Sequence, residues 1–120
     1  MRTEKIVFDN LDITIHYLIG ENAKDNFAVI DEAIETDIWI HAERDSSCHV
    51  VALFPDPSRK FNIKEFNEII QKGAELCKFY TNKLSRLKKK IPFIYTEIQN
   101  VKKTKTAGLV IATHTLTISV

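Results

Sequence analysis

The chain has 120 residues, of which 44% are apolar and 28% charged, with a formal net charge of +1. A chain of this length is expected to form a single domain around one hydrophobic core, here residues 1–120. No apolar run approaches the roughly 18 residues needed to cross a bilayer, and the N-terminus leads into a strand-like run rather than a signal peptide. We therefore expect a cytoplasmic protein with no membrane contact. Two cysteines are too few for a disulfide framework.

The charge is distributed unevenly along the chain. Residues 1–50 contain 4 basic and 11 acidic residues, whereas residues 51–120 contain 13 basic and 5 acidic residues. The small net charge thus conceals an acidic half and a basic half, and it does not exclude a nucleic-acid ligand.

The first half of the chain predicts a hairpin followed by a helix. Two short runs rich in β-branched residues, 5–8 and 13–19, are separated by a turn at 10–12. Apolar side chains then recur at helical spacing, with Asn22 placed to cap the helix. This stripe consists of Ala23, Phe27, Ile30 and Ile34.

A second hairpin is predicted from residues 37–42 and 49–54, and Pro55 ends it. Downstream, Asn62 and Glu65 predict a capping box at the start of a long helix. Its apolar stripe runs from Phe66 to Leu87.

The last third of the chain returns to β-structure. Pro92 must lie beyond the end of the long helix, because the residue before a proline avoids the helical region. We expect a strand over 93–98, a basic loop over 102–108, and a final hairpin or bent strand over 109–120. The order ββαββαβββ with short links predicts an α+β domain of mainly antiparallel hairpins packed with two helices.

One polar patch is predicted on the second hairpin. Alternation along residues 37–42 places Asp37, Trp39 and His41 on the same face. If residues 42–48 form the loop, His49 lies opposite His41 and joins them. A loop shorter by one residue would turn His49 to the other face, and the sequence leaves this register open.

Several chemistries are compatible with such a patch. The indole and imidazole rings could stack on unpaired bases. One aspartate and two histidines could hold a metal ion, and a histidine pair could act in acid–base catalysis. Alternatively, Trp39 anchors the core and the histidines have structural roles.

A second candidate feature is basic. Residues 78–106 contain nine basic residues and one acidic residue, Glu97. Lys78, Lys83, Arg86 and Lys90 lie off the apolar stripe of the predicted helix. Such a surface suits phosphate binding, although many lysine-rich helix faces are simply solvated.

Several segments together resemble one known family, the NFACT-R domain, which is the RNA-binding module of the NFACT proteins. The similarity extends over about residues 5–120. The segments that carry it are Gly20-x-Asn22-x-x-x-Asn26, Asp37-x-Trp39-x-His41, Ser47-Cys48-His49-Val50, Tyr95-Thr96, Asn100-Val101-Lys102-Lys103 and Gly108-Leu109-Val110. In the family a Gly-Ser pair commonly precedes the second histidine, where this chain has Ser47-Cys48.

The resemblance implies an RNA-binding module for tRNA or rRNA, with the ribosome as a further candidate partner. It implies no catalytic site, cofactor or metal. Full NFACT proteins act in ribosome-associated quality control, but their other domains do not fit in 120 residues, so this chain resembles a free-standing R domain. Two alternatives remain: an RNA-processing or other enzyme built on Asp37, His41 and His49, and a protein-interaction module.

The resemblance also implies roles for individual residues. Phosphates would be held by Lys88, Lys89, Lys90, Lys102, Lys103 and Lys105. A base or sugar would contact Trp39, His41 and His49, or else these residues would shape the loop that makes the contact. Residues expected to shape the site are Asp37, Ser47 and Gly108.

Overall fold

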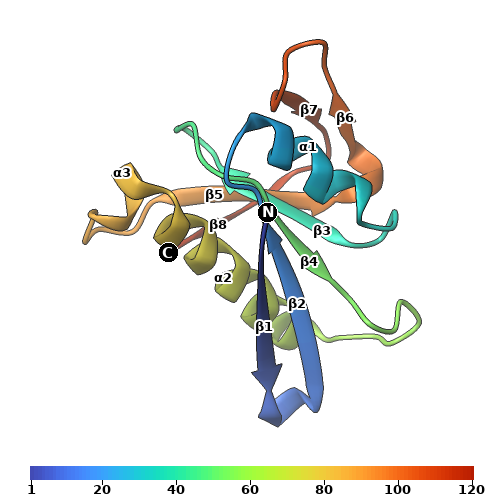
Figure 1. Ribbon diagram of the computed structural model, residues 1–120. Helices are drawn as coiled ribbons and strands as arrows, with labels where there is room; N and C mark the ends of the chain where they lie inside the picture. The colour runs from blue at the N-terminus through green and yellow to red at the C-terminus, as the bar shows by residue number, and fades with distance from the viewer.

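The computed structural model describes all of residues 1–120, and its largest unit is a six-stranded antiparallel sheet (Figure 1). The strand order is β1-β2-β4-β3-β5-β8, and a separate two-stranded sheet contains β6 and β7. The strands are β1 (Arg2–Phe8), β2 (Ile13–Ile19), β3 (Ile38–Ala42), β4 (Val50–Leu53), β5 (Pro92–Glu97), β6 (Val101–Lys103), β7 (Val110–Ala112) and β8 (Leu116–Ser119).

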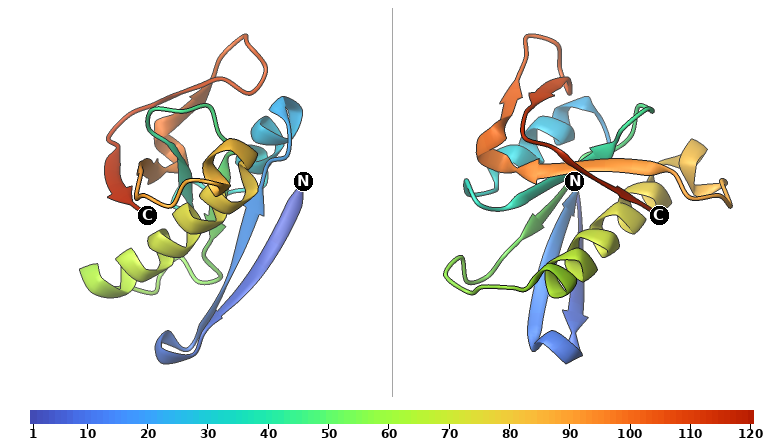
Figure 2. Two further views of the ribbon diagram at one scale, coloured as in Figure 1. Left: turned by 90° about the vertical axis from the view of Figure 1, so that its left-hand side faces the viewer. Right: turned by 180° about the vertical axis from the view of Figure 1, so that it is seen from behind.

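Helices and the small sheet cover the two faces of the large sheet (Figure 2). The long helix α2 (Ile63–Tyr80) packs on one face, where Ile69 and Ile70 join Ile40 and other strand residues in the main core. On the other face, Val29 and Ile30 of α1 (Ala23–Asp31) pack with Trp39, and the β6–β7 hairpin packs beside them. The alternation along β3 is as predicted, but it sends successive side chains into two different apolar clusters, with Ile38 and Ile40 in one and Trp39 in the other.

The first half of the chain largely agrees with the sequence predictions. In the β1–β2 hairpin, Phe8 lies opposite Ile13 across a short 3₁₀ turn, η1 (Asp9–Leu11). Asn22 caps α1 by accepting a hydrogen bond from the backbone N–H of Asp25. The predicted stripe was wrong at both ends, because Ala23 is exposed in the first turn and Ile34 is exposed beyond the end of the helix. The helix stops early because the Asp37 carboxylate accepts the Ile34 N–H at 2.9 Å and closes a turn there.

Helix α2 begins as predicted and ends earlier than predicted. Both hydrogen bonds of the Asn62–Glu65 capping box are present. The helix stops at Tyr80, because Thr81 adopts an extended backbone, and a separate short helix α3 (Asn82–Ser85) follows. Lys83, Arg86 and Lys90 therefore do not lie on the long helix.

The C-terminal predictions need two corrections. Part of the expected basic loop is strand β6, which pairs with β7. Of the two alternatives predicted for residues 109–120, the hairpin is wrong, because β7 pairs with β6 in the small sheet while β8 pairs with β5 in the large one. A second 3₁₀ turn, η2 (Ile98–Asn100), links β5 to β6, and His114 between β7 and β8 has a positive φ of 55°.

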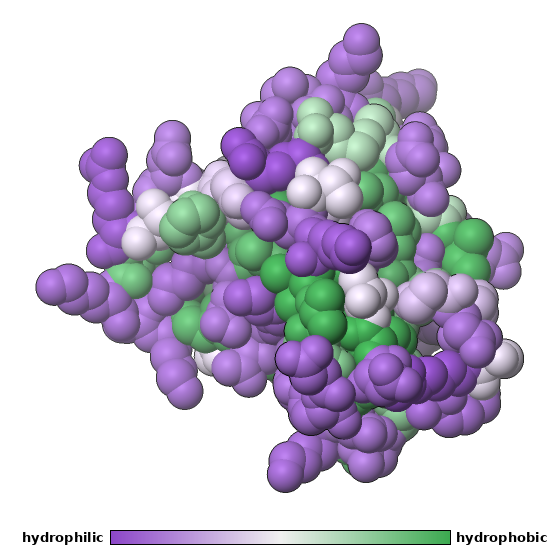
Figure 3. Space-filling view, turned by 60° about the horizontal axis from the view of Figure 1, so that its bottom comes forward, coloured by the Kyte–Doolittle hydropathy of each residue, from purple (hydrophilic) through white to green (hydrophobic).

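The α+β class with antiparallel pairing is confirmed, with α3 as an additional short helix. Seen from below, hydrophilic side chains dominate the periphery and apolar side chains lie toward the middle of the face (Figure 3). No helix has the length and apolar character that spanning a membrane requires.

Candidate nucleic-acid interface

The β3–β4 hairpin brings Trp39, His41 and His49 together. Ile40 lies opposite Val50, and the same register continued by one residue places His41 opposite His49. The two imidazole centroids are 4.9 Å apart, and the Trp39 and His41 rings stack at 5.5 Å with an interplanar angle of 4°. Of the two registers that the sequence allowed, the structure has the one that forms this cluster.

A hydrogen bond from Trp39 defines the tautomer of His49. The indole Nε1–H donates to His49 Nδ1 at 3.1 Å. Because an indole nitrogen only donates, Nδ1 carries no proton and the neutral ring carries its proton on Nε2. Burial, together with the neighbouring His41, lowers the pKa of His49 to about 3. His49 is therefore neutral at physiological pH.

His41 has the opposite tautomer. Its Nδ1 lies 2.6 Å from the carbonyl oxygen of Ala42, which can only accept, so the proton is on Nδ1. Burial lowers the pKa of His41, against weaker opposing effects of the Ala42 and Ser47 backbone. The cluster therefore contains two neutral imidazoles rather than a charged pair.

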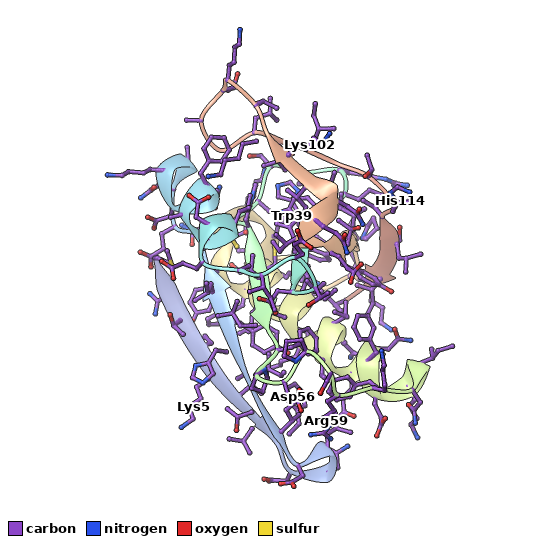
Figure 4. All side chains as sticks on the ribbon, turned by 90° about the vertical axis from the view of Figure 1, so that its right-hand side faces the viewer. Lys5, Trp39, Asp56, Arg59, Lys102 and His114 are labelled. Carbon is purple, nitrogen blue, oxygen red and sulfur yellow. The ribbon has the colours of Figure 1, made fainter.

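Trp39 and Asp37 are structural in this arrangement. Trp39 is only 2% exposed and lies within the fold in Figure 4, so its ring has no free face for a base. The Asp37 carboxylate is occupied by the backbone N–H groups of Ile34 and Phe54, at 2.9 and 3.0 Å. It does not join the histidines, and no group of three His, Cys, Asp or Glu side chains is placed to hold a metal ion.

A cleft of about 780 Å³ opens beside the two histidines. Four stretches that are distant in sequence form its walls: the β2–α1 junction, the β3–β4 loop, the α2–α3 junction and the tip of the β6–β7 hairpin. The lining residues from these stretches include Gly20, Asn22, Asn26, His41, Ser46, Ser47, Cys48, His49, Thr81, Asn82, Ala107, Gly108 and Leu109.

Gly20 and Asn26 hold the start of β4 against the β2–α1 junction. The Gly20 N–H donates to the His49 carbonyl at 2.9 Å, and the His49 N–H donates to Asn26 Oδ1 at 3.1 Å. A Cβ at position 20 would lie 2.1 Å from Asn26 Oδ1, so only glycine allows this approach. The Gly-x-Asn-x-x-x-Asn motif therefore fixes the backbone of His49.

Gly108 holds the hairpin tip close to α1. Its φ is +79°, a left-handed conformation that favours glycine. A Cβ there would lie 2.9 Å from Cα of Ala23. This contact closes the cleft wall between the hairpin and α1.

The Ser47 hydroxyl ties the β3–β4 loop to β3. It accepts the Ala42 N–H and donates to the Cys48 carbonyl, both at 3.0 Å. The side chain thus sets the shape of the loop in which Cys48 and His49 lie.

The two predicted groups of lysines lie apart. Lys102, labelled in Figure 4, and Lys105 are exposed on the β6–β7 hairpin. Lys88, Lys89 and Lys90 lie before β5, beside the last residue of the chain. Lys103 is ion-paired with Asp31, and its ammonium lies 5.2 Å from the centroid of the Phe27 ring, so it holds the hairpin to α1. In this conformation Lys103 is not a free cation.

Several residues that line the cleft carry no signal in the sequence. At one end, the Arg2 guanidinium lies 4.6 Å from the Tyr80 ring centroid and the Tyr80 hydroxyl donates to Glu4. These residues come from β1 and from the end of α2, and no local pattern marks them. Asn22 and Asn26 were part of the family-like motif, which was the available signal for them.

The fold and the cleft define a small α+β domain in which residues of several family-like motifs converge on one recess. Residues 6–119 match the family model for the RNA-binding domain of NFACT proteins, and the chain belongs to this family. Its fold is similar to the C-terminal part of the fibronectin/fibrinogen-binding protein from Streptococcus suis, with a TM-score of 0.73 and 19% sequence identity. That match covers 100% of this chain and 45% of the other. A search of curated proteins found no match.

Proposed function

We propose that this domain binds structured RNA of the tRNA or rRNA class, and that the RNA contacts the cleft beside His41 and His49. One observation carries the proposal: residues from four of the six family-like segments, separated by up to about ninety residues, line the same cleft. A module of this kind would work in the cytoplasm, with the ribosome as its partner in translation or ribosome-associated quality control.

Neutral polar groups inside the cleft suit contacts to a base or a sugar. His49 Nε2–H has no hydrogen-bond partner within the protein, and the His49 ring lines the cleft. Ser46 and Asn82 add a hydroxyl and an amide. Single-stranded RNA is read through such hydrogen bonds to base edges and 2′-hydroxyls.

Apart from Arg2 at one end, the cations lie around the cleft rather than in its lining. Lys105 lies two residues before Ala107 in the hairpin wall, and Lys83 directly follows Asn82 in the opposite wall. Both are exposed and neither forms an ion pair. Phosphates of an RNA inserted into the cleft would meet these side chains, together with Lys102 further along the hairpin.

Fluorescence anisotropy with labelled tRNA over a salt series tests this proposal. Binding should weaken steeply with salt, because each neutralised phosphate releases counterions. Replacing Lys102 and Lys105 by alanine together should lower the steepness of log K against log salt by about 1.4 to 1.8 if each contacts one phosphate.

The matched control replaces Lys60 and Lys64, which are exposed near the start of α2, away from the cleft. This variant has the same change in net charge and should keep the wild-type slope. A flat salt dependence, no binding at about 50 mM salt, or equal effects of the two double variants would contradict the proposal.

A further inference from the structure

Two cysteines from distant segments lie in contact behind the wall of the cleft. Cys48 Sγ in the β3–β4 loop and Cys77 Sγ near the end of α2 are 3.8 Å apart. A disulfide has an S–S bond of about 2.05 Å, so each sulfur would need to move by less than about 1 Å. Both cysteines are free thiols in this structure.

The surroundings hold the two thiols in this position. Cys77 Sγ lies 3.2 Å from the Cys48 carbonyl oxygen, and the Cys48 N–H donates to the Thr81 hydroxyl at 3.1 Å. That hydroxyl donates in turn to the Cys77 carbonyl at 2.8 Å. The loop and the helix end are therefore already joined by hydrogen bonds around the sulfur pair.

The two thiols differ in access. Cys48 is half-buried and lines the cleft, so a small solute can reach it. Cys77 is fully buried behind it. Contact with the Cys77 thiol and the Thr81 hydroxyl lowers the pKa of Cys48, whereas burial raises that of Cys77. This is the arrangement of one attacking thiolate and one resolving thiol.

We propose that Cys48 and Cys77 form a redox site that takes a peroxide as oxidant and closes to a reversible intramolecular disulfide. In the first step the Cys48 thiolate attacks one peroxide oxygen, the O–O bond breaks, and hydroxide leaves to give a sulfenic acid. Cys77 sulfur then attacks Cys48 sulfur and breaks the S–O bond, and the departing hydroxide takes the Cys77 proton. Together two thiols lose two electrons, and one hydrogen peroxide becomes two waters.

The disulfide would replace a hydrogen-bonded contact by a covalent one between the β3–β4 loop and α2. Cys48 is adjacent in sequence to both Ser47 and His49, so the bond fixes the cleft wall in which both lie. The proposal does not depend on RNA binding, because it rests on the position and access of the two sulfurs alone.

The test treats the reduced full chain with hydrogen peroxide, quenches with an alkylating reagent after denaturation, and measures the intact mass. The oxidised monomer should take up no alkyl group and weigh two hydrogen atoms less than the reduced chain. Proteolysis should yield a fragment linking Cys48 to Cys77, and dithiothreitol should restore both thiols. The proposal would be overturned if both cysteines were still alkylated after a peroxide dose that oxidises a small-molecule thiol. It would also be overturned if only intermolecular dimers formed.

Two single variants test the roles assigned to each thiol. Cys77→Ser should stop at a sulfenic acid on Cys48, which dimedone traps. Cys48→Ser should leave Cys77 unmodified at the same peroxide dose, because that thiol is buried. The order of attack would be rejected if peroxide modified Cys77 in the Cys48→Ser variant as fast as the disulfide forms in the wild type. Mapping of the wild-type disulfide does not require either variant to fold.

Discussion

The indole N–H of Trp39 controls the protonation of His49, because it can donate a hydrogen bond and cannot accept one. Protonating His49 on Nδ1 would break the 3.1 Å bond and place a charge in a buried cluster beside His41. The hydrogen bond from Trp39 to His49 therefore explains why the side of the cleft formed by the histidines is neutral.

The neutral state of His49 predicts how stability depends on pH. An unfolded histidine binds a proton near pH 6.5, whereas folded His49 binds one only near pH 3. Above about pH 6.5 the neutral His49 ring makes its full contribution to the free energy of unfolding. Below that pH the free energy of unfolding falls by up to ~1.4 kcal/mol per pH unit. Urea unfolding between pH 7.5 and 5 should show this decline, to which His41 adds in the same direction.

A pair of histidine variants isolates the effect. His49→Gln should reduce the decline, whereas His16→Gln, at an exposed position on β2, should keep it. An unchanged pH dependence in His49→Gln would show that His49 is not held neutral by its surroundings.

The position of the cluster could be predicted from the sequence, but its burial could not. Alternation placed Trp39 and His41 on one face, and one of the two possible registers added His49. Trp39 is covered by Val29 and Ile30 of α1, and the β6–β7 hairpin packs against the same cluster. These segments are distant in sequence, and no local pattern indicates that they meet over the indole.

At the scale of elements, features encoded by neighbouring residues were predictable. The capping box of α2 involves residues three positions apart, and both of its bonds form. The end of α2 depends on Thr81, whose hydroxyl accepts the N–H of Cys48, 33 positions away. Likewise, β6 exists because it pairs with β7, and the lysine-rich composition of residues 102–108 favoured a loop instead.

Docking of the β6–β7 hairpin on α1 gives a prediction at this scale. Gly108→Ala should destabilise the fold by more than about 1 kcal/mol, since alanine is strained at positive φ and its Cβ would meet the backbone of Ala23. It should also weaken RNA binding by displacing the hairpin wall of the cleft. Urea unfolding and the tRNA anisotropy assay measure the two effects.

The neighbouring Ala107→Ser serves as the control, because Ala107 is exposed and has no positive φ. It should change the unfolding free energy by less than about 0.5 kcal/mol. If both variants lost the same free energy of unfolding, the hairpin tip would tolerate any substitution poorly and Gly108 would have no special role.

Across the whole molecule, the uneven charge does not form one continuous basic face. Lys88–Lys90 precede β5 and Lys102–Lys105 follow it, so the strand separates the two groups (Figure 1). Ion pairing of Lys103 with Asp31 further reduces the free charge on the hairpin. The cleft is therefore distinguished by the motif residues that line it rather than by a high density of lysines. The proposed function requires that RNA contacts this cleft.

An NMR titration of ¹⁵N-labelled protein with an unlabelled RNA stem-loop from tRNA tests this claim most directly. The account predicts that amide shifts concentrate in the four walls of the cleft, at residues 20–26, 46–49, 81–82 and 107–109. The amide shifts of the β1–β2 turn and of residues 58–60 should stay unchanged. Arg59 joins these two segments by hydrogen bonds to the carbonyl groups of Leu11 and Asp12. Shifts confined to residues 85–90, or to the β1–β2 turn, with the cleft unaffected, would contradict it.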